Sequence, residues 1–134
     1  MRNFMKVLIT LVVFSAALFA GEKNPLFTHI TSDSVHKSTM ALQFSNKMQK
    51  KGHHVTIYLT DTAVRVASKN LGQFERAQTI IADLVKNGAE IYICPMCMKE
   101  YGVEGEDLVK GLQVGNADLL EKALFAPNVS TINW

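Results

Sequence analysis

The chain has 134 residues, 48% of them hydrophobic and 19% charged, with a formal net charge of +2 at pH 7. Lys and Arg form no cluster that could follow a phosphate backbone, so nucleic acid is not an expected partner. Two cysteines are too few for a small disulfide-scaffold protein.

Residues 1–20 have the features of a secretory signal peptide. Arg2 and Lys6 precede an apolar run over residues 7–20 that is shorter than the roughly 20 residues needed to span a bilayer. We expect cleavage before Gly21, a periplasmic or secreted product, and no stable membrane insertion after cleavage. Leu18 is larger than the residue usual three positions before a cut, so an uncleaved anchor is the alternative.

Residues 21–134 are then one domain, large enough to bury its own core. Removing Arg2 and Lys6 leaves 12 basic and 12 acidic side chains, so the mature protein is close to neutral. The basic character of the whole chain is mostly a property of the signal.

The first half of this domain alternates strand-like and helix-like segments. Residues 25–31 are apolar and β-branched, which predicts a strand, and residues 32–34 offer capping oxygens to a helix. That helix should end at Gly52, and residues 55–60 predict a second strand. The pattern between residues 61 and 73 is weak, which indicates a loop with a short helix.

A second helix is predicted before Gly88, where a cation and a glycine close the segment. A third strand over residues 90–93 leads directly into Cys94. The apolar stripe of that helix is formed by Ala77, Ile80, Ile81, Leu84 and Val85.

The last part of the chain predicts one more helix and one more strand. Asn116 can cap a helix over residues 117–126, which Pro127 stops, and residues 129–134 read as a strand. Strands that alternate with helices need crossover connections, so the fold class is α/β, with a mainly parallel sheet and helices on both faces.

The two cysteines, Cys94 and Cys97, form a Cys-Pro-Met-Cys motif at the end of the third strand. Ligands and chemistry collect at the carboxyl ends of strands in an open parallel sheet. Pro95 suits the first position of a helix, which puts Cys94 at its N-cap, where thiolate is favoured over thiol. Cys97 lies one turn further on and could resolve a disulfide or persulfide formed on Cys94.

These residues resemble the DsrE/DsrF-like family of sulfur-relay proteins. The resemblance runs from "FTHITSD" to the C-terminal "VSTINW", and its most specific element is a cysteine ending the third strand, with a glycine eight residues later and then an apolar residue. Cys94, Gly102 and Val103 match it. The resemblance implies a three-layer α/β/α sandwich on a five-stranded parallel sheet, assembled into trimers or hexamers, with Cys94 carrying sulfur as a persulfide.

The function expected from this combination is sulfur handling or thiol/disulfide chemistry by a sulfur carrier or sulfurtransferase. Its partners would be a sulfur donor and an acceptor thiol, on proteins or on small sulfur compounds, and no cofactor is expected. The export signal and the second cysteine depart from the usual pattern of the family, in which cytoplasmic members act with a single functional cysteine.

Two alternatives use the same cysteines without turnover. A static disulfide is permitted in an oxidising compartment, although the loop it closes is very small and short loops gain least from cross-linking. A metal clip would need further ligands, of which His29 and His36 are on the rim expected for Cys94. A thioredoxin-like enzyme is disfavoured, because the motif follows the third strand instead of the first.

Several polar and sulfur-containing residues are first interpreted as structural. We expect His29 to be hydrogen-bonded in the core, Asp33 to cap a helix, and His53 and His54 to begin a strand. The acidic residues 100–107 predict a solvated loop or a lid over the cysteines. The methionines expected to pack in the core are Met40, Met48, Met96 and Met98.

Overall fold

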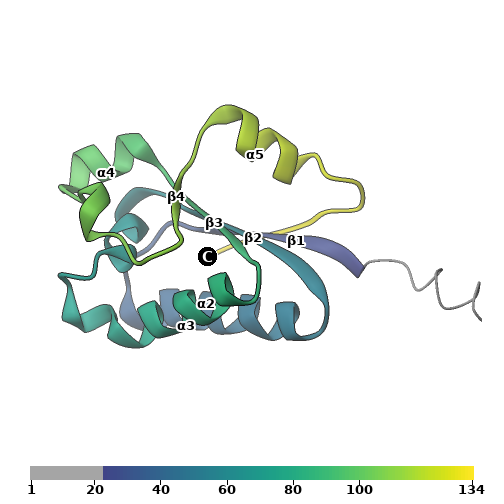
Figure 1. The fold of residues 1–134 in the computed structure, drawn as a ribbon, viewed down its shortest axis with the longest axis horizontal. Helices are drawn as coiled ribbons and strands as arrows, with labels where there is room; N and C mark the ends of the chain where they lie inside the picture. The colour runs from purple at the N-terminus through teal and green to yellow at the C-terminus, as the bar shows by residue number, and fades with distance from the viewer. Residues whose placement is uncertain (1–22) are drawn as a thin grey trace, which may run out of the picture.

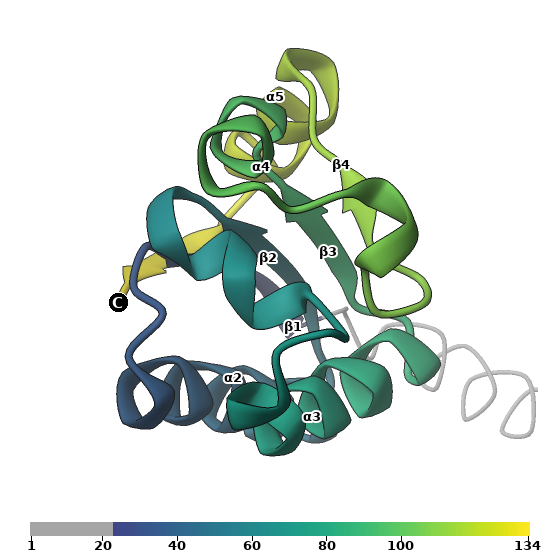
Figure 2. The same cartoon turned by 90° about the vertical axis from the view of Figure 1, so that its left-hand side faces the viewer.

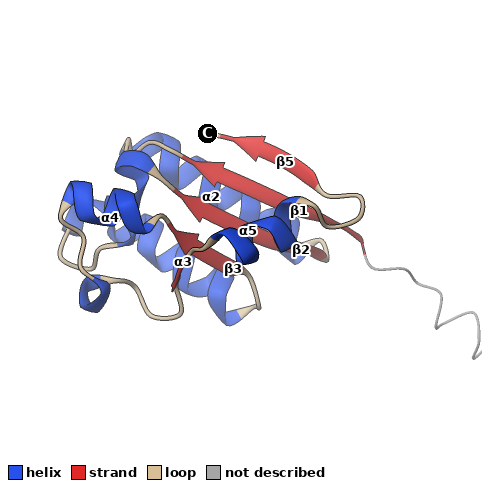
Figure 3. Ribbon diagram, turned by 90° about the horizontal axis from the view of Figure 1, so that it is seen from above, coloured by secondary structure: helices blue, strands red, loops and turns tan. Residues whose placement is uncertain are grey.

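The computed structural model of the protein describes residues 23–134, which form one parallel sheet covered by helices on both faces. Every strand pairs with its neighbour in parallel, in the order β4-β3-β2-β1-β5, and the labelled arrows in Figure 3 all point the same way. The strands are β1 (Lys23–Ile30), β2 (His53–Leu59), β3 (Glu90–Ile93), β4 (Gln113–Val114) and β5 (Ser130–Asn133).

The helices divide between the two faces of the sheet, which gives the three layers seen in Figures 1 and 2. Helices α2 and α3 lie side by side on one face, and α4 and α5 lie on the other. The helices are α2 (Val35–Lys50), α3 (Glu75–Lys86), α4 (Pro95–Tyr101) and α5 (Ala117–Leu124). Short 3-10 helices η1 (Asp61–Ala67), η2 (Gly72–Phe74) and η3 (Gly105–Asp107) lie in the connections.

The core lies between the sheet and the α2/α3 layer. Strand positions alternate between faces, so Ile30, Leu59 and Ile93, which are in register on adjacent strands, are all fully buried on this side. Thr28 on β1 points the same way and shares a hydrogen bond of 2.9 Å with the buried Ser45 of α2. A buried hydroxyl is thereby satisfied inside the core.

The α/β class, the parallel sheet and the three layers are as predicted. The strand over residues 90–93 has the predicted bounds, and η1 and η2 account for the weak pattern between residues 61 and 73. Strand β4 was not in the elements predicted from the pattern, because its two residues, both exposed, have no periodicity to recognise. The predicted signal over residues 1–20 lies outside the described residues, and within residues 23–134 no helix is long and apolar enough to cross a membrane.

Two structural interpretations of side chains are wrong. Asp33 caps no helix: its carboxylate accepts a hydrogen bond of 2.8 Å from Arg65 on η1, while Ser34 stands at the N-cap of α2 without a side-chain cap bond. Of the methionines, Met98 is buried and Met48 packs against the core, but Met40 is 43% exposed and Met96 is 79% exposed. Met96 therefore projects from the cysteine motif into solvent.

Candidate functional site

Cys94 sits where β3 ends and α4 begins, as predicted. Its N–H donates to the carbonyl of Leu59 at the end of the neighbouring strand (3.0 Å), which fixes the backbone at the carboxyl edge of the sheet. Pro95 occupies the first turn of α4 and Cys94 is its N-cap. The cap is made by sulfur: the Cys97 N–H donates to Cys94 Sγ at 3.3 Å.

The second sulfur lies directly beside the first. Both cysteines are free thiols, and the Cys97 thiol donates to Cys94 Sγ across 2.7 Å. Cys97 Sγ also accepts a hydrogen bond of 3.1 Å from the backbone N–H of Asp61, the first residue of η1. Cys94 is 7% exposed and Cys97 is half-buried, so a reagent from solvent meets the pair from the side of Cys97.

A row of ring-bearing residues crosses the sheet below the cysteines. His29, Tyr58 and Tyr92 are aligned on β1, β2 and β3, and the His29 and Tyr58 rings stack with centroids 5.7 Å apart. The Tyr58 hydroxyl is close enough to Cys94 to lower the pKa of that thiol. Burial and the neighbouring Cys94 and Cys97 sulfurs raise the pKa of Tyr58 to about 12, so its hydroxyl keeps its proton as a donor.

The surroundings shift the pKa values of the two thiols in opposite directions. Burial alone would raise the pKa of Cys94, but hydrogen bonds from the Cys97 side chain and backbone, together with the Tyr58 hydroxyl, outweigh it, and the pKa of Cys94 is lowered. Burial and donation to Cys94 raise the pKa of Cys97. Of the two thiols, Cys94 is therefore the one that loses its proton more readily, which suits a nucleophile with a nearby resolving group.

The turn after α4 explains the glycine of the motif. Gly102 ends the helix in the left-handed region, with φ of 65°, where a side chain would be strained. Val103 is then buried, and its N–H bonds to the carbonyl of Met98 at 2.9 Å. The spacing from Cys94 to Gly102 and Val103 thus corresponds to a short helix with Cys94 at its N-cap and Gly102 at its C-cap.

The outer surface of the site is an open depression beside Cys97. Its floor and walls come from the start of η1 and from α4, and its lining residues are Thr60, Asp61, Met96, Cys97, Glu100 and Tyr101. The acidic residues 100–107 begin at this depression, and the part around η3 is tied down by backbone bonds from Lys69 to Asp107 and from Val109 to Ala67.

The histidines do not assemble a metal site with the cysteines. His29 Nε2 is hydrogen-bonded to the Thr60 hydroxyl at 2.7 Å, as expected, but the residue is half-buried at the carboxyl edge of the sheet and is not part of the core; His36 is exposed on α2. His53 and His54 begin β2. Within residues 23–134 no three His, Cys, Asp or Glu side chains form a group that could hold a metal ion.

The fold and the motif agree with a known family. The profile of the DsrE/DsrF-like family matches residues 26–126, which include both cysteines and all elements from most of β1 to α5. The chain belongs to the DsrE/DsrF-like family. The resemblance noted from the residues around Cys94 is thereby confirmed at the level of the family.

Similar proteins extend this DsrE/DsrF-like assignment without adding an activity. "Uncharacterized protein MJ0989" of Methanocaldococcus jannaschii is 27% identical over 111 residues, covering 78% of this chain and 97% of that protein. Among solved structures, the ychN protein of E. coli matches with a TM-score of 0.71 and 12% identity, over 84% of this chain and 100% of that one. MTH1491 of Methanobacterium thermoautotrophicum, a protein of unknown function, gives 0.69 and 13% over the same shares.

Three residues near the cysteines were not predicted from the sequence: Tyr58, Asp61 and Tyr101. Tyr58 alternates with the core residues Ile57 and Leu59, which would have placed it on the opposite face of its strand. Asp61 lies two residues beyond the end of that strand, so it could be assigned to the carboxyl edge. The exposed Tyr101 gave no signal of its contact with Asp61, because the two are joined only by the fold.

Proposed function

We propose that the protein handles sulfur through Cys94, as a persulfide carrier or sulfurtransferase in which Cys97 is the resolving thiol. The observation that carries the proposal is the pair of free sulfurs 2.7 Å apart at the carboxyl edge of the sheet, with the Cys97 N–H donating to Cys94 Sγ. Membership of the DsrE/DsrF-like family supports the same class of chemistry.

Loading begins with the Cys94 thiolate. It attacks the outer sulfur of a persulfide or polysulfide donor, the donor's S–S bond breaks, and the donor leaves as a thiolate while Cys94 gains one sulfur atom. Tyr58 and the Cys97 N–H are placed to stabilise negative charge on Cys94 before the attack. An acceptor thiolate that attacks the outer sulfur then takes it and restores the Cys94 thiolate.

Cys97 provides a second outcome. Its thiolate can attack Cys94 Sγ, which forms the Cys94–Cys97 disulfide and releases the outer sulfur as hydrosulfide. The same attack on a mixed disulfide releases the other partner as a thiolate. Return to the dithiol then requires reduction by a partner dithiol, so the pair can also serve thiol/disulfide exchange.

The test is uptake of sulfur from inorganic polysulfide, followed by intact-protein mass spectrometry. The wild-type protein should gain the mass of one or more sulfur atoms in a form that a small thiol removes. Cys94→Ser should abolish the gain, and Cys97→Ser should let the loaded form accumulate because nothing nearby resolves it. Equal loading of Cys94→Ser and wild type would contradict the assignment of Cys94.

The alternatives of a static disulfide and a metal clip give different results in the same preparation. A static disulfide predicts no fast thiol in the native protein and equal loss of stability in both variants. A metal clip predicts metal in elemental analysis, released by either substitution. Rapid alkylation of metal-free protein at Cys94 alone would exclude both.

We further propose that the protein works outside the cytoplasm. The support is the sequence of residues 1–20, with Arg2 and Lys6 ahead of the apolar run. Exported material should begin at Gly21. Full-length protein found by mass spectrometry in the cytosol would remove this part of the proposal.

A homo-oligomer, a trimer or hexamer by resemblance to the family, is proposed as the working assembly. It is supported by large apolar side chains left on the surface, with Phe125 81% exposed and Val114 48% exposed. The nearly neutral mature charge opposes association little. Light scattering that shows a strict monomer at high concentration would contradict it.

A further inference from the structure

Asp61 has a backbone conformation that its residue type seldom adopts. Its φ is 51°, and Asn128 is the other non-glycine residue with a positive φ in the described part of the chain. A non-glycine residue in this region is strained and is retained where the surroundings hold it. Asp61 is the first residue of η1 and is separated from β2 by Thr60 alone, so its conformation sets the direction in which η1 leaves the sheet.

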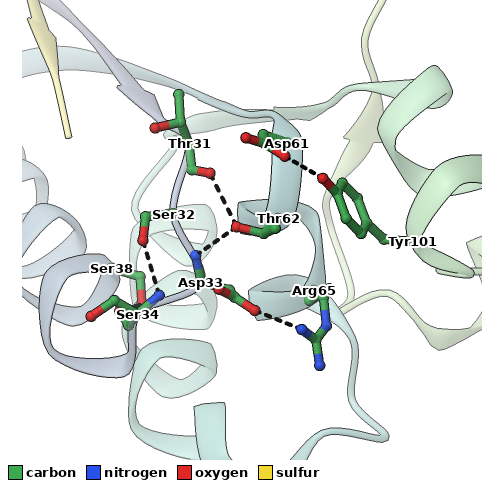
Figure 4. A network of polar contacts seen from close by, with 9 residues as sticks. All are labelled: Thr31, Ser32, Asp33, Ser34, Ser38, Asp61, Thr62, Arg65 and Tyr101. Carbon is green, nitrogen blue, oxygen red and sulfur yellow. Dashed lines mark hydrogen bonds and ion pairs between the residues drawn. The ribbon is translucent and has the colours of Figure 1, made fainter.

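Both polar parts of Asp61 are directed at α4. The backbone N–H donates to Cys97 Sγ at 3.1 Å, and the carboxylate accepts a short hydrogen bond from the Tyr101 hydroxyl. Figure 4 shows Tyr101 reaching from α4 to the Asp61 carboxylate. The two contacts span α4 from Cys97 to Tyr101, so this single residue joins β2 to the whole exposed side of the cysteine helix.

We propose that Asp61 is a positioning residue that keeps Cys97 the protonated partner of Cys94. Its N–H holds the Cys97 sulfur beside Cys94, and its carboxylate, fastened by Tyr101, opposes a second negative charge at Cys97. This inference rests on the proposed function, because it concerns how long a sulfur atom stays on Cys94.

The charged and titratable groups around Cys97 support a protonated Cys97 beside Cys94. Burial and the hydrogen bond to Cys94 are the main causes that raise the pKa of Cys97; the Asp61 N–H acts against them, and the negative charges of Cys94 and of the Asp61 carboxylate add smaller contributions to the rise. Glu100 and Tyr101 share the depression with Cys97, and Tyr58 lies on the side of Cys94. No Lys or Arg lines this depression in the described structure, so the local charge is negative.

The consequence is a slow resolving step. When Cys94 carries an outer sulfur, hydrosulfide leaves only after Cys97 loses its proton and attacks Cys94 Sγ, with one S–S bond formed and one broken. A carboxylate that holds Cys97 in the thiol form delays this reaction. The loaded state then lasts long enough for an acceptor thiol to take the sulfur, which favours transfer over loss as hydrosulfide.

The first test measures Cys97 without Cys94, by alkylation with iodoacetamide in the Cys94→Ser background. Asp61→Asn keeps the N–H, tolerates the left-handed backbone and removes the charge. It should make Cys97 react about two- to fivefold faster at neutral pH and shift the pH profile of the rate downward. Tyr101→Phe should shift the profile in the same direction by less. Glu121→Gln, which removes an exposed charge on α5, is the matched control and should change nothing.

An unchanged or slower Cys97 rate in Asp61→Asn would overturn the inference. Asp61→Gly, which relieves the backbone constraint, gives the same comparison if the asparagine variant folds poorly. The Asp61→Asn effect must also be absent for Cys94 in the Cys97→Ser background, since a shift of both thiols alike would indicate a general change in the site.

The second test follows hydrosulfide release after loading with inorganic polysulfide. Asp61→Asn should release it faster than wild type by a similar factor, and the difference should vanish when Cys97 is also replaced by serine. Equal release rates with Cys97 present would contradict the inference. If Cys94 takes up no sulfur, the proposed function fails instead, while the alkylation of Cys97 still decides the role of Asp61.

Discussion

The two faces of the sheet are built for different purposes. On the α2/α3 face, the inward side chains of the central strands β1, β2 and β3 are buried and, apart from Thr28, mostly aliphatic, and α3 contributes Ala77, Ile81 and Leu84 to the same core. On the other face stand His29, Tyr58 and Tyr92, and α5 has no buried residue at all. The first face carries the aliphatic core, and the second carries the rings next to the cysteines under a helix, α5, that buries none of its residues.

The largest expected effect is a loss of stability confined to the packed face. Leu84→Ala on α3 should reduce the free energy of unfolding by about 2 to 5 kcal/mol, because it leaves a cavity in a fully buried cluster. The same substitution at Leu124 on α5, which is 38% exposed, should cost only about 0.5 kcal/mol. Urea denaturation measures both, and similar losses would show that the faces do not differ in this way.

Substitutions on the face that carries Tyr58 and Tyr92 should change the reactivity of Cys94 more than the stability of the fold. Tyr58→Phe removes the hydroxyl that lowers the pKa of Cys94, so alkylation of Cys94 at neutral pH should slow by about three- to tenfold with little change in stability. Tyr92→Phe is the matched control: the Tyr92 hydroxyl interacts with Glu90, at the start of the same strand, and not with Cys94, so the Cys94 rate should not change. Equal slowing by both substitutions would assign the effect to packing of the rings.

A smaller effect is expected from the Asp33–Arg65 ion pair, which should contribute to stability and not to the reactivity of the cysteines. Asp33→Asn weakens the half-buried ion pair with Arg65, shown in Figure 4, and should cost about 0.5 kcal/mol of stability. The alkylation rate of Cys94 should stay at the wild-type value. A slower rate would mean that the connection between β1 and η1 also positions the cysteines.

The smallest expected effect is in the pH dependence of stability. Because the pKa of Cys94 is lowered in the folded protein, the unfolded chain binds more protons between that pKa and the ordinary cysteine value. In Cys97→Ser, where only this thiol titrates, stability should therefore rise as pH rises through that interval and be lost as pH falls below it. Cys94→Ser should lack the rise. Urea midpoints measured across this interval for the two variants provide the check.

The sequence predicted the elements whose signals are local. Asn116 was expected to cap the last helix, and its side chain accepts from the Leu119 N–H at 3.0 Å. Cys94 was placed at a helix N-cap by the proline that follows it, which is also a nearest-neighbour signal. Both predictions needed only the preferences of a few consecutive residues.

The remaining features depend on contacts between distant segments. Strand β4 exists because the Gly115 N–H reaches the carbonyl of Ile93 at 2.8 Å, a bond that no periodicity in two residues could reveal. The positive φ of Asp61 and its two contacts with α4 require the positions of β2 and β3 to be known. The lowering of the Cys94 pKa was predicted from the helix terminus, but Tyr58 and the Cys97 side chain, which also cause it, could only be found in the structure.

The pairing of β1 with β5 also has a consequence for how the chain folds. β1 is the first strand of the described chain, yet its second neighbour, which aligns Ser130 with Leu26, is the last. During synthesis one edge of β1 therefore stays unpaired until nearly every other residue has been made, and pairing over such a separation is slow. An apolar strand with an open edge is a site for aggregation, so newly made chains would gain from a chaperone until β5 joins the sheet.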